Sequence, residues 1–307
     1  MKNNSLALLL LFFLHSSWAY DTSKAGYAID INGEINEYTI FSIFVLPNQV
    51  ITIRAESNLD LKSESVTLLK TDIGLWTGTA PKLPGWYSIV ISSDAGKPMK
   101  INVLVLTPIS QKNGEYLNGY RIGYYPAKPL NGNEIYKRPE GFFECHASEL
   151  ENQLSPHFKV SQFMCKQASD YPKYLIVSER LLLKLEYLLE QTNNAGFAIE
   201  TFGFVSGYRT PYYNKSIKNV PYSRHVYGGA ADIFIDQDLD GYFDDLNNDQ
   251  VTNEKDVEIF HQLIESQYNL PEYEKFRGGL GFYKNNGVHK GFIHVDVRGT
   301  RARWGHP

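Results

Sequence analysis

The sequence predicts a mixed fold in two parts: an all-β sandwich over residues 20–107 and an α+β domain over 142–307. The first part is predicted by short strand-like runs that turn signals separate at regular spacing. The second is predicted by helical and strand-like periodicities that occur in the same stretch of chain. The 307 residues are enough for two domains, and a formal net charge of -4 does not indicate a nucleic-acid binder.

The N-terminus predicts a secretory signal peptide over residues 1–19. Lys2 supplies a positive charge, residues 5–14 form an apolar segment too short to span a bilayer, and Ser17 and Ala19 are the small residues that a signal peptidase reads. An uncleaved membrane anchor is the alternative. We therefore expect a periplasmic or secreted protein with no membrane span after the signal is removed.

The sandwich is predicted strand by strand. Two strand-like runs occupy residues 40–57, another ends the stretch 76–93, and a further one covers 99–108. Short strands at this spacing are typical of an immunoglobulin-like domain. Because residues 20–107 contain no cluster of histidines and carboxylates, we expect a module that positions the chain or binds the cell wall or a protein. A purely structural role is the alternative.

Between the sandwich and the C-terminal domain the sequence has no regular hydrophobic pattern, and helices and strands are predicted again after it. Residues 108–141 are rich in Gly, Pro, Asn and Tyr, which predicts a linker or an irregular surface wrap. Residues 178–196 predict a helix, because Ser178 is a candidate cap and leucines recur at helical spacing. Residues 197–209 predict a strand that leads into a loop, and residues 257–270 predict a second helix.

Only two cysteines are present, Cys145 and Cys165. In an exported chain an even number of cysteines permits a disulfide. Such a bridge would close a loop of about 20 residues and stabilise the fold by about 3 kcal/mol. Two buried free thiols are the alternative, and the spacing does not indicate a metal site.

Two strand-like stretches are apolar on one face and polar on the other. In residues 291–299, His294 and Asp296 alternate with Ile293 and Val295, so the imidazole and the carboxylate share a face. In residues 223–236, a loop with His225 and two glycines precedes a strand that carries Asp232 on the face opposite its apolar residues. Both stretches thus combine an apolar face, suited to a core, with a face that bears potential metal-binding or catalytic side chains.

If these strands are neighbours in a sheet, His225, Asp232 and His294 converge on one point. Two imidazoles and one carboxylate form a normal catalytic zinc set, with the fourth position left to water. Zinc lowers the pKa of bound water and polarises a carbonyl. Four other histidines are interpreted as core or surface residues: His146, His157, His261 and His306.

These residues resemble a known family. HVYGGAAD (225–232) fits the His-x6-Asp motif of the zinc D-Ala-D-Ala carboxypeptidases, the LAS metallopeptidases, whose relatives include the hedgehog signalling domain. SGYRTPYYN (206–214) is similar to the family's arginine loop, and FIHVD supplies the last histidine. The resemblance covers about residues 150–305 and has four motifs in the family's order, the fourth being the flanking residues in SRH…YG…AAD (223–232). It implies a hedgehog/DD-peptidase fold, in which a small antiparallel sheet with flanking helices carries zinc.

The resemblance also implies roles for individual residues. His225, Asp232 and His294 match the zinc ligands of the family. Arg209 matches the arginine that binds the substrate carboxylate or the developing oxyanion, a task for which a rigid, permanently charged guanidinium is suited. The implied reaction is cleavage of peptide bonds in peptidoglycan, often next to D-alanine.

The general base departs from the family pattern. Gly291 stands three residues before the last zinc histidine, where many relatives have an acid. His289 resembles a second histidine that steadies the transition state in some relatives. Asp296 is the nearest acid, and it either acts as the base or orients a ligand histidine through a hydrogen bond.

Residues 236–256, DQDLDGYFDDLNNDQVTNEKD, predict a calcium-type loop. The start matches the D-x-D-x-D-G pattern, and a second, overlapping frame begins at Asp245. Acids this dense repel one another unless cations neutralise them, although a solvated acidic loop is the alternative. The candidate calcium ligands are Asp236, Asp238, Asp240, Tyr242 (through its carbonyl), Asp244, Asp245, Asn247, Asp249 and Asp256.

The sequence as a whole predicts an exported zinc metallopeptidase that hydrolyses peptidoglycan stem or cross-link peptides, with zinc and calcium as cofactors. The first alternative is a non-catalytic, zinc-containing binding module of the same fold that serves as a cell-wall or partner adaptor, because Gly291 replaces an expected acid. The second alternative is a calcium-dependent adhesion protein, which would leave the three zinc-type residues without a purpose.

Overall fold

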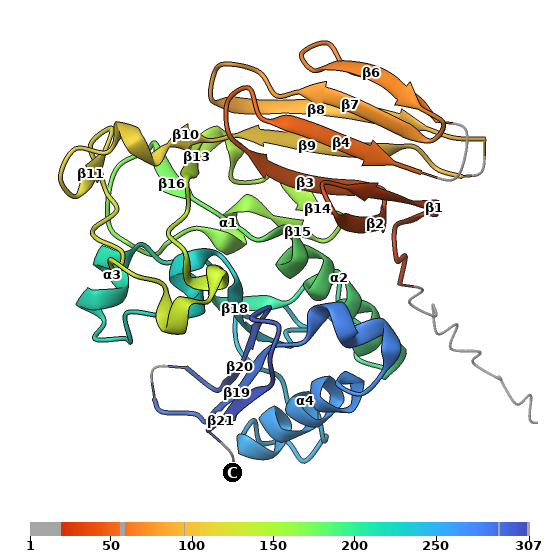
Figure 1. The fold of residues 1–307 in the computed structure, drawn as a ribbon. Coiled ribbons are helices and arrows are strands. Elements are labelled where there is room, and N and C mark those ends of the chain that lie inside the picture. The colour runs from red at the N-terminus through yellow and green to blue at the C-terminus, as the bar shows by residue number, and fades with distance from the viewer. Residues whose placement is uncertain (1–19, 56–58, 95, 288, 306–307) are drawn as a thin grey trace, which may run out of the picture.

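The computed structural model describes residues 20–55, 59–94, 96–287 and 289–305. The predicted signal peptide, residues 1–19, lies outside the described residues, as does His306. The described chain is a strand-rich mixture of several small sheets and helices (Figure 1). The predicted mixed α and β composition is therefore confirmed.

The N-terminal part is a sandwich of two sheets, with strand orders β2-β1-β4-β7-β6 and β3-β9-β8-β5. Buried residues of both sheets, such as Ile53 and Val103, belong to one hydrophobic core. The turn after Val45 does not form a hairpin, since β3 and β4 lie in different sheets. The strands are β1 (Lys24–Ile31), β2 (Glu34–Tyr38), β3 (Ile40–Val45), β4 (Val50–Arg54), β5 (Asp60–Lys62), β6 (Thr67–Asp72), β7 (Leu75–Thr79), β8 (Gly85–Ser92) and β9 (Met99–Val105).

The sandwich packs against α2 (Glu179–Asn194) and β14 (Gln153–Ser155) of the C-terminal part (Figure 1). The Phe44 amide of β3 donates to Glu179 Oε1 at 2.9 Å, and the Ser42 hydroxyl donates to the Leu154 carbonyl at 2.7 Å. The buried apolar residues of the two parts form one continuous cluster. The sandwich is thus held directly on the second part of the chain.

Residues 108–141 wrap around the C-terminal part, which is the second of the two sequence interpretations. Leu117 and Ile122 are fully buried, and the Tyr125 hydroxyl donates to the Val226 carbonyl at 2.8 Å. The segment contains short elements only: β10 (Thr107–Pro108), η1 (Ile109–Gln111), β11 (Tyr116–Leu117), β12 (Tyr120–Arg121), η2 (Leu130–Gly132) and η3 (Glu134–Tyr136). Its aromatic residues therefore serve as packing groups.

The C-terminal part is built on a five-stranded sheet of order β17-β18-β20-β19-β21. The pairings are antiparallel except that of β19 with β21, which is parallel. The strands are β17 (Gly203–Ser206), β18 (Ala230–Phe234), β19 (Gly279–Tyr283), β20 (Phe292–Asp296) and β21 (Ala302–Trp304). The strand predicted over 197–209 is thus shorter, in part because the Asn193 side chain holds the Ile199 amide and carbonyl in a loop.

The predicted helices are present. The Ser178 side chain at the N-cap of α2 makes no capping hydrogen bond. Five leucines that recur at helical spacing are buried as expected: Leu181, Leu182, Leu185, Leu188 and Leu189. The second long helix, α4 (Glu254–Gln267), begins earlier than the predicted residue 257 because the Asn253 side chain accepts the Lys255 amide. The remaining elements are β13 (Gly141–Cys145), η4 (Ala147–Glu149), β15 (Phe158–Lys159), α1 (Val160–Phe163), β16 (Lys173–Leu175), α3 (Pro211–Ser216), η5 (Arg224–Tyr227) and η6 (Pro271–Phe276).

Lys184 of α2 is buried beneath the C-terminal sheet and donates to the Asp296 carbonyl at 2.8 Å. Burial lowers its pKa to about 7. The unfolded chain therefore binds more protons than the folded one between pH 7 and the ordinary pKa of 10.5, so Lys184 makes stability rise with pH across this window.

We expect Lys184→Met to remove this pH dependence. In urea titrations the unfolding free energy of the wild type, relative to that of the variant, should rise between pH 7 and pH 9 by an amount on the order of 1 kcal/mol. A parallel pH dependence of the two proteins would contradict the assignment.

The predicted disulfide is wrong for this structure, because both cysteines are free and buried. Cys145 ends β13, where its thiol lies 3.4 Å from the His146 carbonyl. Cys165 follows α1 and lies beside the Tyr120 hydroxyl instead. Burial raises the pKa of the Cys145 thiol to about 12, so it stays protonated. Different neighbours thus surround the two sulfur atoms.

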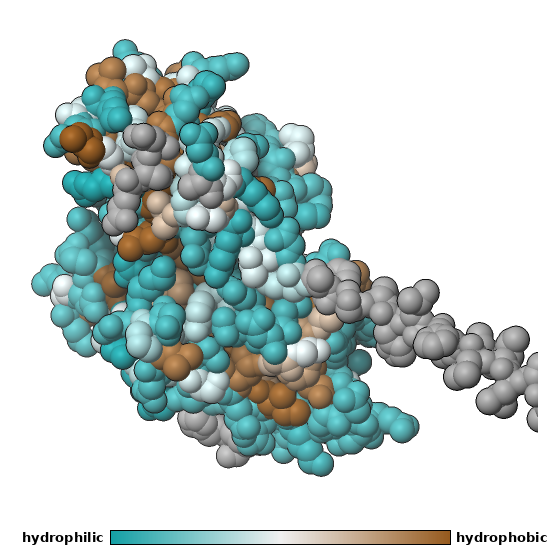
Figure 2. Space-filling view, turned by 90° about the vertical axis from the view of Figure 1, so that its right-hand side faces the viewer, coloured by the Kyte–Doolittle hydropathy of each residue, from teal (hydrophilic) through white to brown (hydrophobic). Residues whose placement is uncertain are grey.

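The face of the molecule shown in Figure 2 is predominantly hydrophilic, with hydrophobic residues in separate patches. Several of the most exposed apolar side chains, Leu69, Ile73 and Leu83, belong to the sandwich. None of the helices in the described part of the chain combines the length and the hydropathy of a membrane span.

Candidate metal centre

β18 and β20 lie side by side and align Asp232 directly opposite His294. The flanking pairs, Ala231 with Val295 and Ile233 with Ile293, are buried in the hydrophobic core on the other face of the sheet. The alternation of side chains along each strand thus separates a core face from a polar face. The expected neighbourhood of the two strands is confirmed.

His225 reaches the same face from η5, the 3-10 turn that precedes β18. Gly228 ends this turn in the left-handed region, at φ +67°. A Cβ at Gly228 would lie 2.3 Å from the Ile176 carbonyl oxygen. Only glycine therefore allows the chain to turn here and to bring His225 back over β18.

We expect Gly228→Ala to destabilise the fold by about 3 kcal/mol, of which about 1 kcal/mol reflects the left-handed backbone and the rest the clash. Gly114→Ala is a matched control, because Gly114 has a similar φ of +58° and open space around its Cβ position. Urea unfolding should show the larger loss for Gly228→Ala. Equal losses would mean that the contact with Ile176 is unimportant.

The three side chains present their ligand atoms to one another at short range. His225 Nε2 lies 3.1 Å from both Asp232 Oδ1 and His294 Nδ1, and His294 Nδ1 lies 2.8 Å from Asp232 Oδ1. In a tetrahedral zinc site with bonds of about 2.0–2.1 Å, two ligand atoms are about 3.3 Å apart. The triangle therefore has nearly the dimensions that a zinc ion needs.

Hydrogen bonds behind the two imidazoles decide which nitrogens are available. His225 Nδ1 lies 2.7 Å from the Gly207 carbonyl, which can only accept, so Nδ1 carries the proton and Nε2 keeps a lone pair. His294 Nε2 lies 3.2 Å from Asp296 Oδ2 and can donate to it, so Nδ1, which faces Asp232, is the nitrogen that would bind a metal after losing its proton. Three potential ligand atoms thus converge, and their chemistry fits zinc.

The pKa values of the three residues are set by burial and by the contacts that the residues make with one another and with their neighbours. Burial lowers the pKa of His225. Burial also opposes the charged form of His294, but hydrogen bonds to Asp232 and Asp296 outweigh it and raise its pKa. For Asp232, burial acts to raise the pKa, while the charge and hydrogen bonds of the two imidazoles hold it below the usual range. Asp232 is accordingly an anion at neutral pH.

Arg209 lies at the edge of this triangle and is itself almost fully buried. Its Nη2 donates to Asp232 Oδ2 at 2.5 Å, and its Nε donates to the Ser206 hydroxyl at 2.7 Å. It also lines the pocket above the triangle. The structure therefore brings the sequence-predicted arginine to the site, where it orients Asp232 and faces the space that a ligand would occupy.

Asp296 is completely buried behind His294. Its Oδ2 contacts His294 Nε2, and its Oδ1 accepts the Gly279 amide at 2.8 Å and the Arg298 amide at 3.0 Å. The Arg298 side chain occupies both oxygens as well, with Nη2 at 2.5 Å from Oδ2. Of the two sequence interpretations, this geometry favours the carboxylate that orients a ligand histidine.

We expect Asp296→Asn to weaken zinc binding about 10- to 100-fold, because the amide cannot hold the His294 proton as the carboxylate does. Asp256→Asn is the matched control, since Asp256 is equally buried but caps α4 instead. Zinc dissociation constants from competition with a chromogenic chelator should change for the first variant only. Equal constants for both variants would contradict the orienting role.

The candidates for a general base are placed less favourably. The His289 ring packs edge-on against the Phe292 ring, with the ring centroids 4.6 Å apart. The buried Nδ1 of His289 has no hydrogen-bond partner among the described residues. Burial lowers its pKa, which favours the neutral form that accepts a proton. Gly291 has a φ of +117°, and a Cβ there would lie 2.5 Å from Val257 Cγ2. The acid of the family pattern therefore has no room in this chain.

The triangle lies in the wall of a pocket of about 590 Å³. Phe292 lines the pocket but His289 does not, and among its described lining residues Asp232 is the only carboxylate. Other groups bring positive charge and aromatic surface: Arg209, Arg224, Arg298, Tyr136, Tyr222, Tyr283 and Trp304. The pocket thus combines three guanidinium groups with aromatic walls.

Part of the pocket wall comes from residues that the sequence did not identify as site residues. Leu130 and Tyr136 come from the wrap, residues 108–141, and line the pocket with the C-terminal strands. Arg224 is held there by its contact with the Ile135 carbonyl and by the Tyr136 ring, 5.1 Å from its guanidinium carbon. The only sequence signal was indirect: Arg224 precedes His225, and the wrap is rich in tyrosine.

The acidic loop is only partly assembled. Asp236, Asp238 and Asp244 bring one carboxylate oxygen each to within 4.8 Å of one another. The acids Asp240, Asp245, Asp249 and Asp256 do not belong to this group. Oxygens of both frames accept backbone amides within the loop, such as Asp238 Oδ1 from Asp240 and Asp249 Oδ1 from Val251. The mutual approach of three carboxylates therefore distinguishes the first frame from the second.

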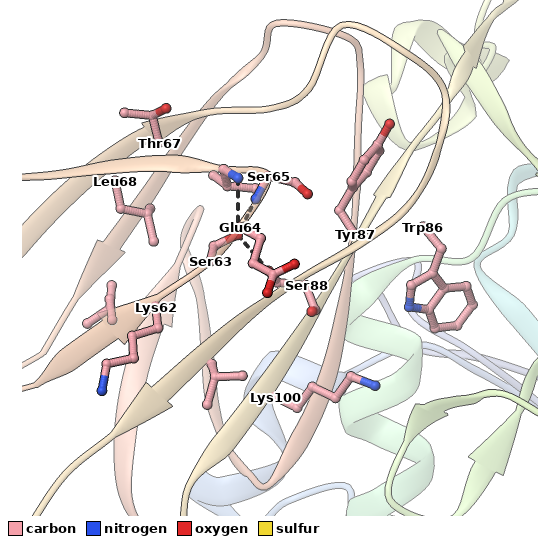
Figure 3. Close-up of a pocket in the computed structure, with 13 residues that line it drawn as sticks. Lys62, Ser63, Glu64, Ser65, Thr67, Leu68, Trp86, Tyr87, Ser88 and Lys100 are labelled. Atoms are coloured by element: carbon pink, nitrogen blue, oxygen red, sulfur yellow. Dashed lines mark hydrogen bonds between the residues drawn. The ribbon is translucent and has the colours of Figure 1, made fainter.

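A second concave surface lies on the sandwich (Figure 3). This pocket of about 830 Å³ is lined by residues of β5, β6 and β8, among them Lys62 and Trp86, and by the connection between β5 and β6, which includes Glu64. The Ser63 hydroxyl donates to the Ser88 carbonyl at 2.7 Å and accepts the amides of the following turn. No cluster of three or more potential metal ligands occurs here among the described residues.

Comparison with known proteins does not assign the chain. No family model matches it, and no curated protein matches it. Among solved structures, domains 4 and 5 of the S-layer protein SbsC match 22% of this chain at 16% sequence identity, with a TM-score of 0.19. The match spans about half of that structure, 48% of its chain. A likeness this weak carries no argument about fold or function.

Proposed function

We propose that this protein is an exported zinc metallopeptidase that hydrolyses stem or cross-link peptides of peptidoglycan. In this proposal the C-terminal part has the hedgehog/DD-peptidase fold, the sandwich is an immunoglobulin-like adaptor for the cell wall or a protein, and residues 1–19 direct the chain to the periplasm or the exterior. The sequence motifs that carry the resemblance are the starting point of this assignment.

The observation that carries the proposal is the convergence of three potential ligand atoms at a pocket. His225 Nε2, Asp232 Oδ1 and His294 Nδ1 lie 2.8–3.1 Å apart, and each imidazole is fixed from behind by an acceptor. These residues would hold zinc, which supplies Lewis acidity toward a peptide carbonyl and an attacking water. Three protein ligands with access from a pocket are typical of catalytic rather than structural zinc.

The charge of the pocket supports a peptide with a free carboxylate as substrate. Arg209, Arg224 and Arg298 line it. Arg209 pairs with Asp232 and Arg298 with Asp296, whereas Arg224 makes no ion pair with a carboxylate among the described residues. A guanidinium pairs with a carboxylate through two parallel hydrogen bonds and cannot lose its charge at physiological pH. The C-terminal carboxylate of a stem peptide fits this environment, and Tyr136 and Trp304 offer surface for the residues beside it.

The non-catalytic binding module remains the second candidate, and one observation favours it. Apart from Asp232, no carboxylate of the described residues lines the pocket, and His289 lies behind Phe292. A pocket of this kind would hold zinc and a carboxylate ligand without transferring a proton. In the peptidase proposal His289 accepts that proton, so the two candidates differ in what His289 does.

The test is to incubate the purified, zinc-loaded protein with a stem peptide that ends in D-Ala-D-Ala and with its C-terminal amide, beside cross-linked muropeptides. Mass spectrometry identifies the products. Release of D-alanine from the free acid but not from the amide identifies a carboxypeptidase, and cleavage of the cross-link identifies an endopeptidase. One equivalent of bound zinc without any turnover would reject the peptidase and favour the binding module.

A further inference from the structure

Asp236 is the acid of the described loop that is both buried and left with an unpaired oxygen atom. Only 8% of the residue is exposed, and its Oδ1 has no hydrogen-bond partner among the described residues. Its other oxygen, Oδ2, accepts the Gly241 amide at 3.1 Å. A buried carboxylate oxygen without a partner is unfavourable, so the native protein needs a group that this oxygen can bind.

Two further carboxylates lie close to the Asp236 carboxylate. One oxygen each from Asp236, Asp238 and Asp244 lies within 4.8 Å of the others. Oxygens bound to one Ca²⁺ at 2.3–2.6 Å lie at most about 5 Å apart. Carboxylate oxygens without sulfur or nitrogen are the ligands of a hard cation, which distinguishes this cluster from the zinc-type triangle.

No side-chain cation offsets this charge. Within the described chain, no lysine, arginine or histidine makes an ion pair with Asp236, Asp238 or Asp244. Burial and the neighbouring carboxylates Asp240 and Asp238 raise the pKa of Asp236. Burial and the neighbouring carboxylates Asp238 and Asp236 raise the pKa of Asp244. The folded loop therefore opposes the ionised state that these acids have at neutral pH.

We propose that Asp236, Asp238 and Asp244 bind one Ca²⁺ ion, with the unpartnered Asp236 Oδ1 as its buried ligand. The ion replaces the missing hydrogen bond and neutralises the crowded carboxylates. The second frame, which begins at Asp245, is not part of this site. This calcium site does not depend on the peptidase function.

The ion would brace elements that support the zinc-type triangle. Asp236 follows β18, the strand of Asp232, and the Asp244 amide donates back to the Ile235 carbonyl at 3.1 Å. Phe243, between the proposed ligands, is buried against Phe260 of α4, with ring centroids 6.3 Å apart. Calcium would thus fasten the end of β18 to α4. We expect its main effect to be on stability.

The experiment uses the purified protein freed of calcium by an immobilised chelator and then reloaded with one equivalent of zinc. Tb³⁺, a calcium analogue, is added and excited through tyrosine, because Tyr242 lies within the loop. We expect sensitised Tb³⁺ emission that Ca²⁺ competes away and that equal Mg²⁺ does not. Thermal unfolding should show a midpoint about 3 °C higher or more with saturating Ca²⁺.

Two exposed acids give a matched pair of variants. Asp238→Ala should lose the emission and the shift in midpoint, whereas Asp249→Ala, in the second frame, should keep both. His225→Ala should also keep both, which separates this site from the zinc site and from peptidase activity. Equal responses of Asp238→Ala and Asp249→Ala, whether retained or lost, would overturn the assignment, as would a wild type without any response.

Discussion

Replacement of His225 by alanine is expected to abolish both stoichiometric zinc binding and peptide hydrolysis. The variant removes one of three ligand atoms and leaves Asp232 and His294 to hold an ion with two. Because the activated water depends on the metal, turnover should fall on the order of 10³-fold or more. Zinc content by elemental analysis and D-alanine release by mass spectrometry measure the two effects independently.

His261→Ala is the control for this variant. His261 is also buried, but it packs against Phe282 in the core, and its ring lies 5.9 Å from that ring. It should lose stability while it keeps its zinc and its turnover per folded molecule. If His225→Ala retained one equivalent of tightly bound zinc, the ligand assignment would fail, whatever the activity.

His289→Ala is expected to lower kcat by about 10²- to 10⁴-fold while zinc content stays at one equivalent. Its buried Nδ1 has no partner among the described residues, and its pKa is lowered, which are the two properties that a neutral proton acceptor needs. His289 is not one of the three residues that converge on the zinc position, so the metal should remain. The measurement is kcat on the D-Ala-D-Ala peptide together with zinc analysis.

His146→Ala is the matched control, because the exposed His146 imidazole lies beside Glu144 and is not part of the candidate metal centre. It should leave both quantities unchanged. Wild-type kcat in His289→Ala would exclude His289 as the base. Since Asp296 is buried and fully engaged, such a result would favour a proton acceptor other than these two side chains.

The elements that the sequence predicted well share a simple local signal. The helix over 178–196 has leucines at helical spacing, and all five expected leucines are buried in α2. In the strands around Asp232 and His294, polar side chains alternate with buried aliphatic ones, so the two faces could be predicted from the order of residues. The sandwich could be predicted from its turns, although the division of its strands between two sheets could not.

The elements that were predicted poorly depend on distant contacts. The disulfide failed because cysteine count and spacing say nothing about which neighbours surround each sulfur. The acidic loop illustrates a related limit: spacing gave nine candidate calcium ligands, and the fold brings the carboxylates of Asp236, Asp238 and Asp244 together and leaves Asp236 Oδ1 unpaired. Spacing gives candidates, whereas the fold decides which atoms remain unpaired.

By itself the sequence determined the residue types, the alternation that brings His294 and Asp296 to one face, and the glycine turn after His225. These are local properties, since they follow from bonding geometry over a few residues. Tertiary structure alone decided that Asp296 stands behind His294 and that Tyr136 of the wrap closes the pocket. The reason is physical: a hydrogen bond or a pocket wall depends on distances in space, and chain spacing does not fix those distances.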